Sequence, residues 1–424
     1  MIHARTLIAL GAALAMSACG DDDAGPAPAP EEPAEAPADA VDEPDDEPSE
    51  GRPAPALDDE TEAALEAMGY LPTAPTDNPE ERGVTRSAAA AYPGVNLYST
   101  RHRASATLVA MDGSTLHEWS AAEGEEHPNR WMHVEPLPGG DLLALAMAHS
   151  VTRHRWDGSI AWRARMPAHH DLAVHDDGRI FALVRWAERL NHEGRQLPVL
   201  VDGIMVLSPG GERRRRVELL PLMREHVDSS RLARIRARVE AGDTAGILRG
   251  GSLGDLMHTN SIEFLRHPID GVAPAGAVLL SFRNINRVAI LSPAMDEVLW
   301  VWGAGELEGQ HDATQIDDGR VLIFDNGTRR RRSRAIEVDA ASGEIVWTYT
   351  DDELYTALRG GAQRLPNGNT LITESDSGHA IEVTRGGDVV WELWNPDVRR
   401  TAEGDERGVI YRLNRFDPSL FPQL

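Results

Sequence analysis

The sequence of 424 residues contains no lysine and a single cysteine, Cys19. All 42 basic residues are therefore arginine, and no disulfide bond can form within the chain. An exported protein of this composition has to be stabilised by its packed core alone. The formal net charge of −26 argues against nucleic acid as a partner, because phosphate binding needs a basic surface. Two short arginine runs, Arg213–Arg216 and Arg329–Arg332, are small and isolated, and we interpret them as solvated turns.

Acidic residues are concentrated near the N-terminus. Residues 21–66 contain 18 Asp and Glu against the single Arg52, with many Pro and Ala and almost no large apolar side chains. Such a segment buries too little apolar surface to offset the entropy lost on ordering. We therefore expect residues 20–91 to form a disordered, acidic, Pro- and Ala-rich linker.

The first 19 residues have the features of an export signal. Arg5 precedes an apolar run from Leu7 to Met16, which is too short to span a bilayer as a helix. The sequence Met16-Ser17-Ala18-Cys19 then resembles the lipobox of bacterial lipoproteins. We predict a lipoprotein signal peptide over residues 1–19 and lipidation of Cys19. The protein would be anchored to a bacterial membrane, facing the periplasm or the cell exterior. The alternative is an ordinary signal peptide with an incidental cysteine.

From residue 92 the sequence repeats a β-rich unit of about 45 residues. Six turns each join two apolar runs: Asp112-Gly113, Asp157-Gly158, Pro209-Gly210-Gly211, Met295-Asp296, Ser342-Gly343 and Gly386-Gly387. The strand after a turn carries a tryptophan at one fixed place in four repeats, at Trp162, Trp300, Trp347 and Trp391. Arg215 holds that place in the third repeat, and Trp119 lies two residues further on in the first. A repeated unit of this length and composition is typical of a β-propeller blade.

The repeat count predicts an all-β fold, a six-bladed β-propeller over residues 92–424, preceded by the disordered acidic tether. We expect the strand Gly408–Arg415 to complete the first blade by pairing near Val95–Tyr98, which leaves no exposed sheet edge. Residues 219–250 have apolar and arginine residues at helical spacing, and we predict a short helical insertion there.

Three histidines fall near the start of predicted innermost strands. His170 and His311 each lie eight residues before the turn glycine of an inner hairpin, and His258 occupies the matching place in the blade after the insertion. Innermost strands line the axis of a propeller, so the three imidazoles should converge. For the adjacent pair His169 and His170, the alignment places His170 toward the axis.

Three converging imidazoles allow several chemistries. They could bind a metal ion, bind an anion while moving protons, or supply a nucleophile. Arg283, on the strand after the His258 hairpin, adds a permanent cation. A cation beside the imidazoles favours an anionic ligand over a metal.

Several motifs resemble the family of bacterial arylsulfate sulfotransferases over roughly residues 92–424. They are Gln310-His311-Asp312-Ala313, Phe324-Asp325-Asn326-Gly327, His169-His170-Asp171, His258-Thr259-Asn260-Ser261, Ser333-Arg334-Ala335-Ile336-Glu337 and the C-terminal Tyr411-Arg412 with Arg415-Phe416. The resemblance implies a six-bladed propeller that moves a sulfuryl group without a nucleotide, cofactor or metal. It implies a phenolic sulfate ester as donor, a phenol as acceptor and ping-pong kinetics.

By motif, the resemblance places the nucleophile, which becomes sulfohistidine, at His311. It places sulfuryl binding and proton shuttling at His170, His258 and Arg283. Well-studied members also carry an N-terminal β-sandwich and a disulfide bond. This sequence has a predicted linker and one cysteine instead, so their mode of dimerisation and substrate entry does not carry over to it.

Two further interpretations remain open at the level of sequence. One is a non-catalytic, lipid-anchored propeller that acts as a binding or assembly module. The turn and tryptophan repeat around Trp347 is shared with the docking repeats of quinoproteins, but we find no vicinal cysteines or calcium-ligand set. The other is a metal-dependent lyase or hydrolase.

Overall fold

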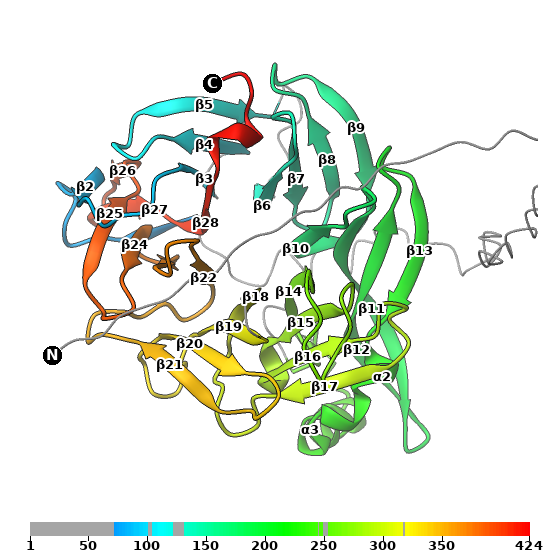
Figure 1. Cartoon of the computed structure of the whole chain (residues 1–424). Coiled ribbons are helices and arrows are strands. Elements are labelled where there is room, and N and C mark those ends of the chain that lie inside the picture. Colours follow the sequence, from blue (N-terminus) through cyan, green and yellow to red (C-terminus); the bar gives the residue numbers. More distant parts are fainter. Residues whose placement is uncertain (1–71, 101–103, 122–130, 245, 249–252, 317–318) are drawn as a thin grey trace, which may run out of the picture. The chain divides into compact units, whose positions relative to one another are not determined.

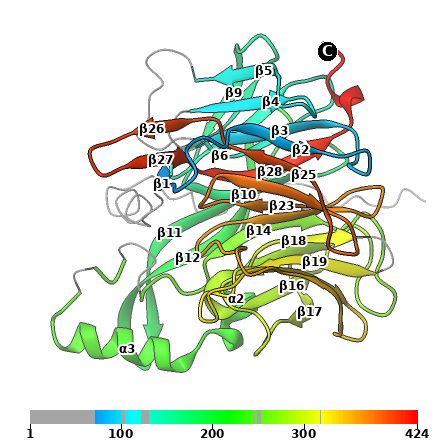
Figure 2. The same ribbon diagram turned by 90° about the vertical axis from the view of Figure 1, so that its left-hand side faces the viewer.

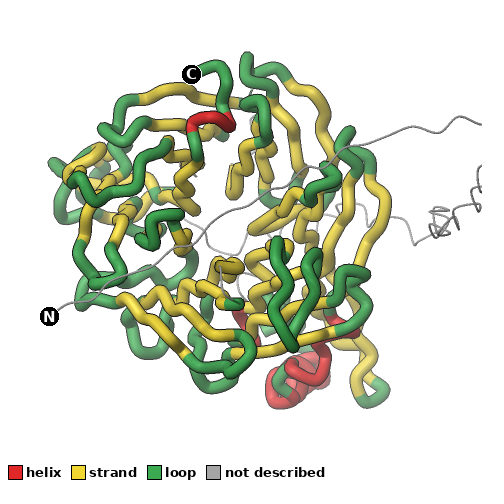
Figure 3. Tube along the Cα trace, viewed as in Figure 1, coloured by secondary structure: helices red, strands yellow, loops and turns green. Residues whose placement is uncertain are grey.

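The computed structural model describes residues 72–424, apart from 101–103, 122–130, 245, 249–252 and 317–318. The predicted signal peptide, Cys19 and the linker as far as residue 71 lie outside these described residues. In the described part of the chain, strands predominate and the few helical turns gather mainly beside one blade (Figure 3). No helix found there is long and apolar enough to cross a membrane.

Six antiparallel sheets built from the described residues surround a common axis as the blades of a propeller (Figure 1). From the innermost strand outward, the first three blades are β28 (Ile410–Phe416), β3 (Val95–Thr100), β4 (Ser105–Val109) and β5 (Thr115–Ser120); β6 (Trp131–Pro136), β7 (Leu142–Ala146), β8 (Ser150–His154) and β9 (Ile160–Arg165); and β10 (Ala168–Val174), β11 (Ile180–His192), β12 (Arg195–Leu207) and β13 (Arg213–Glu218).

The remaining three blades follow in chain order. They are β14 (Thr259–Phe264), β15 (Val278–Phe282), β16 (Arg287–Leu291) and β17 (Val298–Trp302); β18 (His311–Ile316), β19 (Arg320–Asp325), β20 (Arg334–Asp339) and β21 (Ile345–Tyr349); and β22 (Gly361–Arg364), β23 (Thr370–Glu374), β24 (His379–Val383) and β25 (Val389–Trp394). The predicted six-bladed propeller is confirmed.

The C-terminal strand closes the ring as expected. β28 pairs antiparallel with β3, with Phe416 opposite Val95 and Leu413 opposite Tyr98. The first blade is therefore made from both ends of the propeller sequence, and the β3 edge that would otherwise be open is paired with β28.

The prediction of a disordered linker is wrong for residues 72–91. There β1 (Thr73–Pro75) pairs with β27 (Asp405–Gly408), which also pairs with β26 (Val398–Arg400). β2 (Gly83–Ser87) pairs with β25 as a fifth, outermost strand of the sixth blade. These strands find their partners more than three hundred residues away, as in the 2.8 Å hydrogen bond from Thr85 to Glu392, so local composition does not reveal them.

In five of the six blades, a side chain on the fourth strand from the axis binds to the next blade. Indole N–H groups donate to backbone carbonyls in the following blade's outer turn, from Trp162 to Pro209 (3.0 Å), Trp302 to Gly343 (2.9 Å), Trp347 to Arg385 (3.1 Å) and Trp391 to Met111 (2.9 Å). Arg215, which replaces tryptophan in the third blade, donates to Ala294 O at 3.1 Å in the same way. In the fourth blade Trp302 makes the contact, although Trp300 holds the predicted place. The two lie on the same face of β17, two residues apart.

In four blades, N–H groups on the axial edge of the innermost strand donate to side chains of the preceding blade. Asp171 accepts from Ile262 N (3.2 Å), Ser261 from Ala313 N (3.1 Å), Asp312 from Ala362 N (2.9 Å) and Gln363 from Arg415 N (2.7 Å). Each of these N–H groups would otherwise be a buried donor without an acceptor. Polar side chains on the innermost strands are thus part of the ring's construction.

The predicted insertion contains α2 (Leu220–Met223), a 3₁₀ turn η1 (Arg224–His226) and α3 (Ser229–Glu240). Asp228 caps α3 by accepting from Ser230 N at 2.8 Å. On the same helix, Arg231 donates to Leu253 O (2.9 Å) and Asp255 O (2.8 Å). α3 therefore holds the segment that leads into β14.

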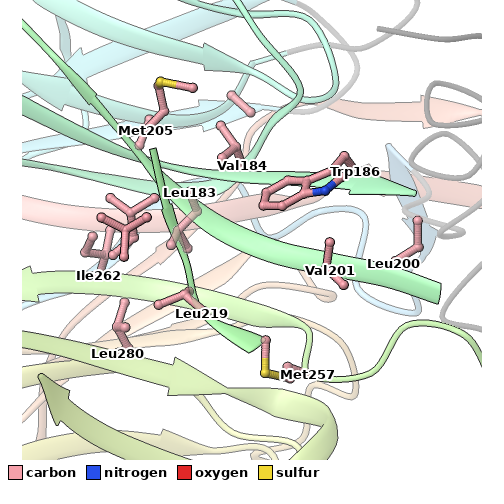
Figure 4. Packing of buried hydrophobic residues seen from close by; sticks show 14 of the residues in the cluster. Leu183, Val184, Trp186, Leu200, Val201, Met205, Leu219, Met257, Ile262 and Leu280 are labelled. Atoms are coloured by element: carbon pink, nitrogen blue, oxygen red, sulfur yellow. The ribbon is translucent and has the colours of Figure 1, made fainter. Parts of the chain in front are cut away.

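A continuous apolar core joins the insertion to the third and fourth blades. Figure 4 shows Leu183 of β11 and Met205 of β12 packed near Leu219, Ile262 and Leu280, all of them buried. Seen from the side, α3, the tips of β11 and β12, and the β26–β27 hairpin all project toward the same side of the molecule (Figure 2).

Candidate functional site

Buried imidazoles from the third and fourth blades contact one another. His170 Nε2 lies 3.1 Å from His258 Nε2, and His170 Nδ1 lies 2.8 Å from His169 Nδ1. All three side chains are buried. His258 contacts His170 rather than the neighbouring His169. His169 instead lies 3.7 Å from the carboxylate of Asp202.

A buried ionic group supports His258 from behind. Its Nδ1 bonds to the carboxylate of Asp255, which also lies 3.4 Å from Arg185 Nη1. Arg185 Nε in turn donates to Asp202 Oδ1 at 2.5 Å, and Asp202 accepts from the backbone N of Thr259 at 2.8 Å. The orientation of His258 is therefore fixed through hydrogen bonds that run between β11, β12 and β14.

His311 is held in one tautomer by Asn326. The Asn326 amide nitrogen donates to the carbonyls of Thr356 (2.7 Å) and Arg359 (2.5 Å), so its oxygen is free to accept. That oxygen lies 2.7 Å from His311 Nδ1, which must therefore carry the proton. His311 Nε2 is left with a lone pair, is buried, and has no hydrogen-bond partner among the described residues.

Arg283 is tied to the His258 segment through the backbone. It begins a 3₁₀ turn, η2 (Arg283–Ile285), and its backbone N donates to His258 O at 3.0 Å. Its guanidinium, which is partly exposed, donates to Asn284 Oδ1 at 3.1 Å. The four predicted residues thus come from β10, the residue just before β14, η2 and β18.

The strand register corrects one detail of the sequence alignment. His311 lies opposite Phe324 in its blade, whereas Thr259, and not His258, lies opposite the corresponding Phe282. His258 therefore precedes the repeat-equivalent position by one residue. The inner hairpin of the fourth blade is longer than the others, so counting back from a turn glycine could not fix its register.

Burial and neighbouring charges disfavour the protonated form of these imidazoles to different degrees. Burial lowers the pKa of His311 well below its usual range, and the charge on Arg283 lowers it further. Burial likewise lowers the pKa of His170 well below its usual range, and the neighbouring His258 lowers it further. The pKa of His258 is also lowered by burial, but the Asp255 carboxylate opposes that effect. His258 is accordingly the member of this set that accepts a proton most readily.

The structure adds residues to the site that sequence reasoning did not assign. Asn326 and Asp255 orient His311 and His258, as described above. Arg412 of β28 lies between the carboxylates of Asp171 and Asp312. The sequence could have indicated Asp171 and Asp312, because each directly follows a predicted site histidine.

Chemically, the arrangement suits an anionic ligand that reacts with a neutral imidazole. A free lone pair on His311, a histidine that can exchange a proton and an arginine cation are the parts that a group transfer needs. Among the described residues, no group of three or more His, Cys, Asp and Glu has a geometry suited to a metal ion.

Comparison with known proteins gives one family match. The sequence profile of the arylsulfotransferase (ASST) family matches residues 133–396, more than half of the chain, and this range includes His170, His258, Arg283 and His311. No curated protein matches the sequence significantly.

Solved structures of similar shape are distant in sequence. A protein of unknown function from Bacteroides caccae superposes with a TM-score of 0.50 at 14% identity, covering 76% of this chain and 98% of that one. Virginiamycin B lyase from Staphylococcus aureus gives a TM-score of 0.42 at 11% identity, covering 75% of this chain and 86% of that one. The first similarity supports the fold alone, and the second is too weak to carry an argument.

The buried neutral histidines predict that the protein loses stability in mild acid. Burial lowers the pKa of His169 to about 3, so the unfolded chain binds its proton at a higher pH than the folded protein does. Stability should therefore fall as the pH drops below about 6.5, by up to about 1.4 kcal/mol per pH unit for each such histidine. Urea unfolding at several pH values measures this slope.

His169→Gln should flatten the slope, whereas the exposed His267→Gln should leave it unchanged. Equal slopes for the two variants would contradict the assignment of His169 as a buried neutral histidine.

Proposed function

The chain belongs to the arylsulfotransferase family, and we propose that it transfers a sulfuryl group from a phenolic sulfate ester to a phenolic acceptor through a covalent intermediate on His311. The observation that carries this proposal is the hydrogen bond of 2.7 Å between His311 Nδ1 and Asn326 Oδ1. It directs the proton to Nδ1 and the lone pair to Nε2, the nitrogen that has to attack sulfur.

In the first half of the reaction, the Nε2 lone pair of His311 attacks the sulfur of the donor. A nitrogen–sulfur bond forms while the bond from sulfur to the phenolic oxygen breaks. The leaving oxygen takes a proton from His258, whose Asp255 partner favours the protonated form. His311 keeps its Nδ1 proton, shared with Asn326, so the sulfated ring stays activated for transfer.

In the second half, a phenolic acceptor replaces the released phenol. Its oxygen attacks the sulfur, its proton passes to His258, and the electrons of the nitrogen–sulfur bond return to His311 Nε2. The two halves leave the protein unchanged and give ping-pong kinetics. Arg283 would supply fixed positive charge to the negative sulfuryl oxygens in both transition states, which lowers the barrier. His170 would donate to the same oxygens from Nε2 once the bound donor displaces its contact with His258.

We also propose that the enzyme is an exported lipoprotein anchored through Cys19. The short apolar run and the lipobox-like sequence before Cys19 support this. Cys19→Ser should move the protein from the detergent phase to the aqueous phase when membranes are extracted and phase-separated, because the acyl chains supply the membrane affinity. Identical partitioning of the variant and the natural chain would contradict lipid anchoring.

The covalent intermediate predicts a specific mass change. Mixing the protein with 4-nitrophenyl sulfate should release 4-nitrophenol and add the mass of one sulfuryl group, and phenol should then remove that mass. His311→Ala should abolish the adduct and lower turnover by about 10⁴-fold or more, because the nucleophile is lost. Intact-mass spectrometry and absorbance follow the two signals.

His267→Ala, a change in an exposed turn, serves as the control and should leave both signals intact. The absence of adduct and turnover in the natural chain with any phenolic donor would favour a non-catalytic binding module. An adduct that persists in His311→Ala would place the nucleophile elsewhere.

The role of His258 can be tested through the leaving group. His258→Ala should slow transfer from phenyl sulfate by roughly 10²–10⁴-fold, because its phenolate needs a proton to leave. Transfer from 4-nitrophenyl sulfate should be much less affected, since 4-nitrophenolate is a stable anion. Equal losses for both donors in single-turnover measurements of adduct formation would remove His258 from the proton-transfer role.

A further inference from the structure

Arg412 joins three blades next to the proposed reaction centre. It lies on β28, the strand that closes the propeller. Its Nη1 is 3.3 Å from a carboxylate oxygen of Asp171 on β10, and its Nη2 is 3.1 Å from Asp312 Oδ1 on β18. The Arg412 side chain is only 9% exposed, so these contacts form away from bulk water. We call Arg412, Asp171 and Asp312 the carboxylate clamp.

Both aspartates of the clamp adjoin the histidines that the reaction uses. Asp171 directly follows His170, and Asp312 directly follows His311. The backbone is left-handed at His170 (φ +57°) and at Asp312 (φ +50°), a conformation that residues other than glycine adopt at a cost. Each of these innermost strands also has a bulge at this point. Such a conformation persists only where surrounding contacts hold it.

The clamp supplies such contacts on both strands at once. The Asp171 carboxylate also accepts from Ile262 N, and the Asp312 carboxylate from Ala362 N, at 3.2 and 2.9 Å. Arg412 therefore forms ion pairs with Asp171 and Asp312, and each of these carboxylates also accepts a hydrogen bond from the backbone of the next blade. A shift of its guanidinium would be transmitted through one residue to each imidazole.

We propose that Arg412 is a positioning residue for sulfuryl transfer, which holds His170 and His311 in one alignment by clamping the aspartates that follow them. This inference rests on the proposed function. Because Arg412 lies on β28, pairing of β28 with β3 would also bring the residues of the reaction centre into position. This role does not require Arg412 to contact a substrate.

Charge supports the same role. Burial lowers the pKa of His311, and the charges on Arg283 and Arg412 lower it further, while the hydrogen bond that His311 donates to Asn326 acts in the opposite direction. Burial raises the pKa of Asp312, an effect that Arg412 opposes. Two other titratable groups lie nearby, His133 at 3.3 Å from Asp171 Oδ1 and the half-buried Glu263 on β14.

Arg415 offers a matched control on the same strand. It is also buried, and it pairs with Glu382 and donates to Asn96 Oδ1 at 2.8 Å. None of these partners adjoins a site histidine. Loss of either arginine should destabilise closure of the ring, but only loss of Arg412 should change the chemistry.

The experiment compares Arg412→Gln, Arg412→Lys and Arg415→Gln in the full chain. Single-turnover formation of the sulfuryl adduct is measured from 4-nitrophenyl sulfate across pH, alongside the melting temperature. Arg412→Gln should slow adduct formation by about 100-fold, the effect expected of a small misalignment. Its acid limb should move to higher pH, because losing the cation raises the pKa of His311 and keeps it protonated over a wider range.

Arg412→Lys should restore the acid limb but only part of the rate, because an ammonium group cannot grip two carboxylates as a guanidinium does. Arg415→Gln should lower the melting temperature and leave both the rate and the pH profile of the folded protein unchanged. If Arg412→Gln does not fold, Arg412→Lys provides the test on its own. A reduced rate of adduct formation with an unchanged acid limb would support the clamp, and an unchanged rate would contradict it.

The outcomes separate this inference from the proposed function. An adduct in the natural chain, together with Arg412 variants that behave like Arg415→Gln, would overturn the clamp and leave the proposed function standing. No adduct in the natural chain would overturn the proposed function itself.

Discussion

Each innermost strand of the propeller has an edge without a neighbouring strand, and the N–H groups of that edge need acceptors. In this chain the acceptors are side chains of the preceding blade, such as Asp171 for Ile262 and Asp312 for Ala362. The polar residues nearest the axis therefore serve first to join the blades. The candidate site is built on this ring of contacts, since its histidines adjoin residues that the ring already fixes.

Sequence repetition revealed the architecture because the blades reuse one turn, and five of the six reuse one docking contact. The turn before Trp391 and that before Trp347 could be aligned directly, and Arg215 makes the docking contact where tryptophan is missing. β1 and β2 could not be anticipated in the same way. They pair with strands far away in the sequence, and the acidic composition of the preceding residues led us to extend the predicted linker over them.

The sequence predicted which residue types form the site, but it predicted less well their strand register and hydrogen-bond partners. Equivalent spacing located His170 and His311, but the register of His258 depends on a hairpin of irregular length. The partners that set protonation were hidden, because Asn326 lies fifteen residues from His311 and Asp255 lies in a segment held by α3. Hydrogen bonds between elements, rather than local pattern, decide which nitrogen of each imidazole carries the proton.

Closure of the first blade also constrains how the protein is made. Arg415 and Asn96, which bond across β28 and β3, lie 319 residues apart in the chain. Pairing of such distant segments is slow compared with local folding, and it cannot start before β28 has been synthesised. Until then β3 presents an open edge that can pair with other chains. Newly made molecules are thus most prone to aggregation just before the ring closes, and nicking or shortening of the final strand would recreate that state.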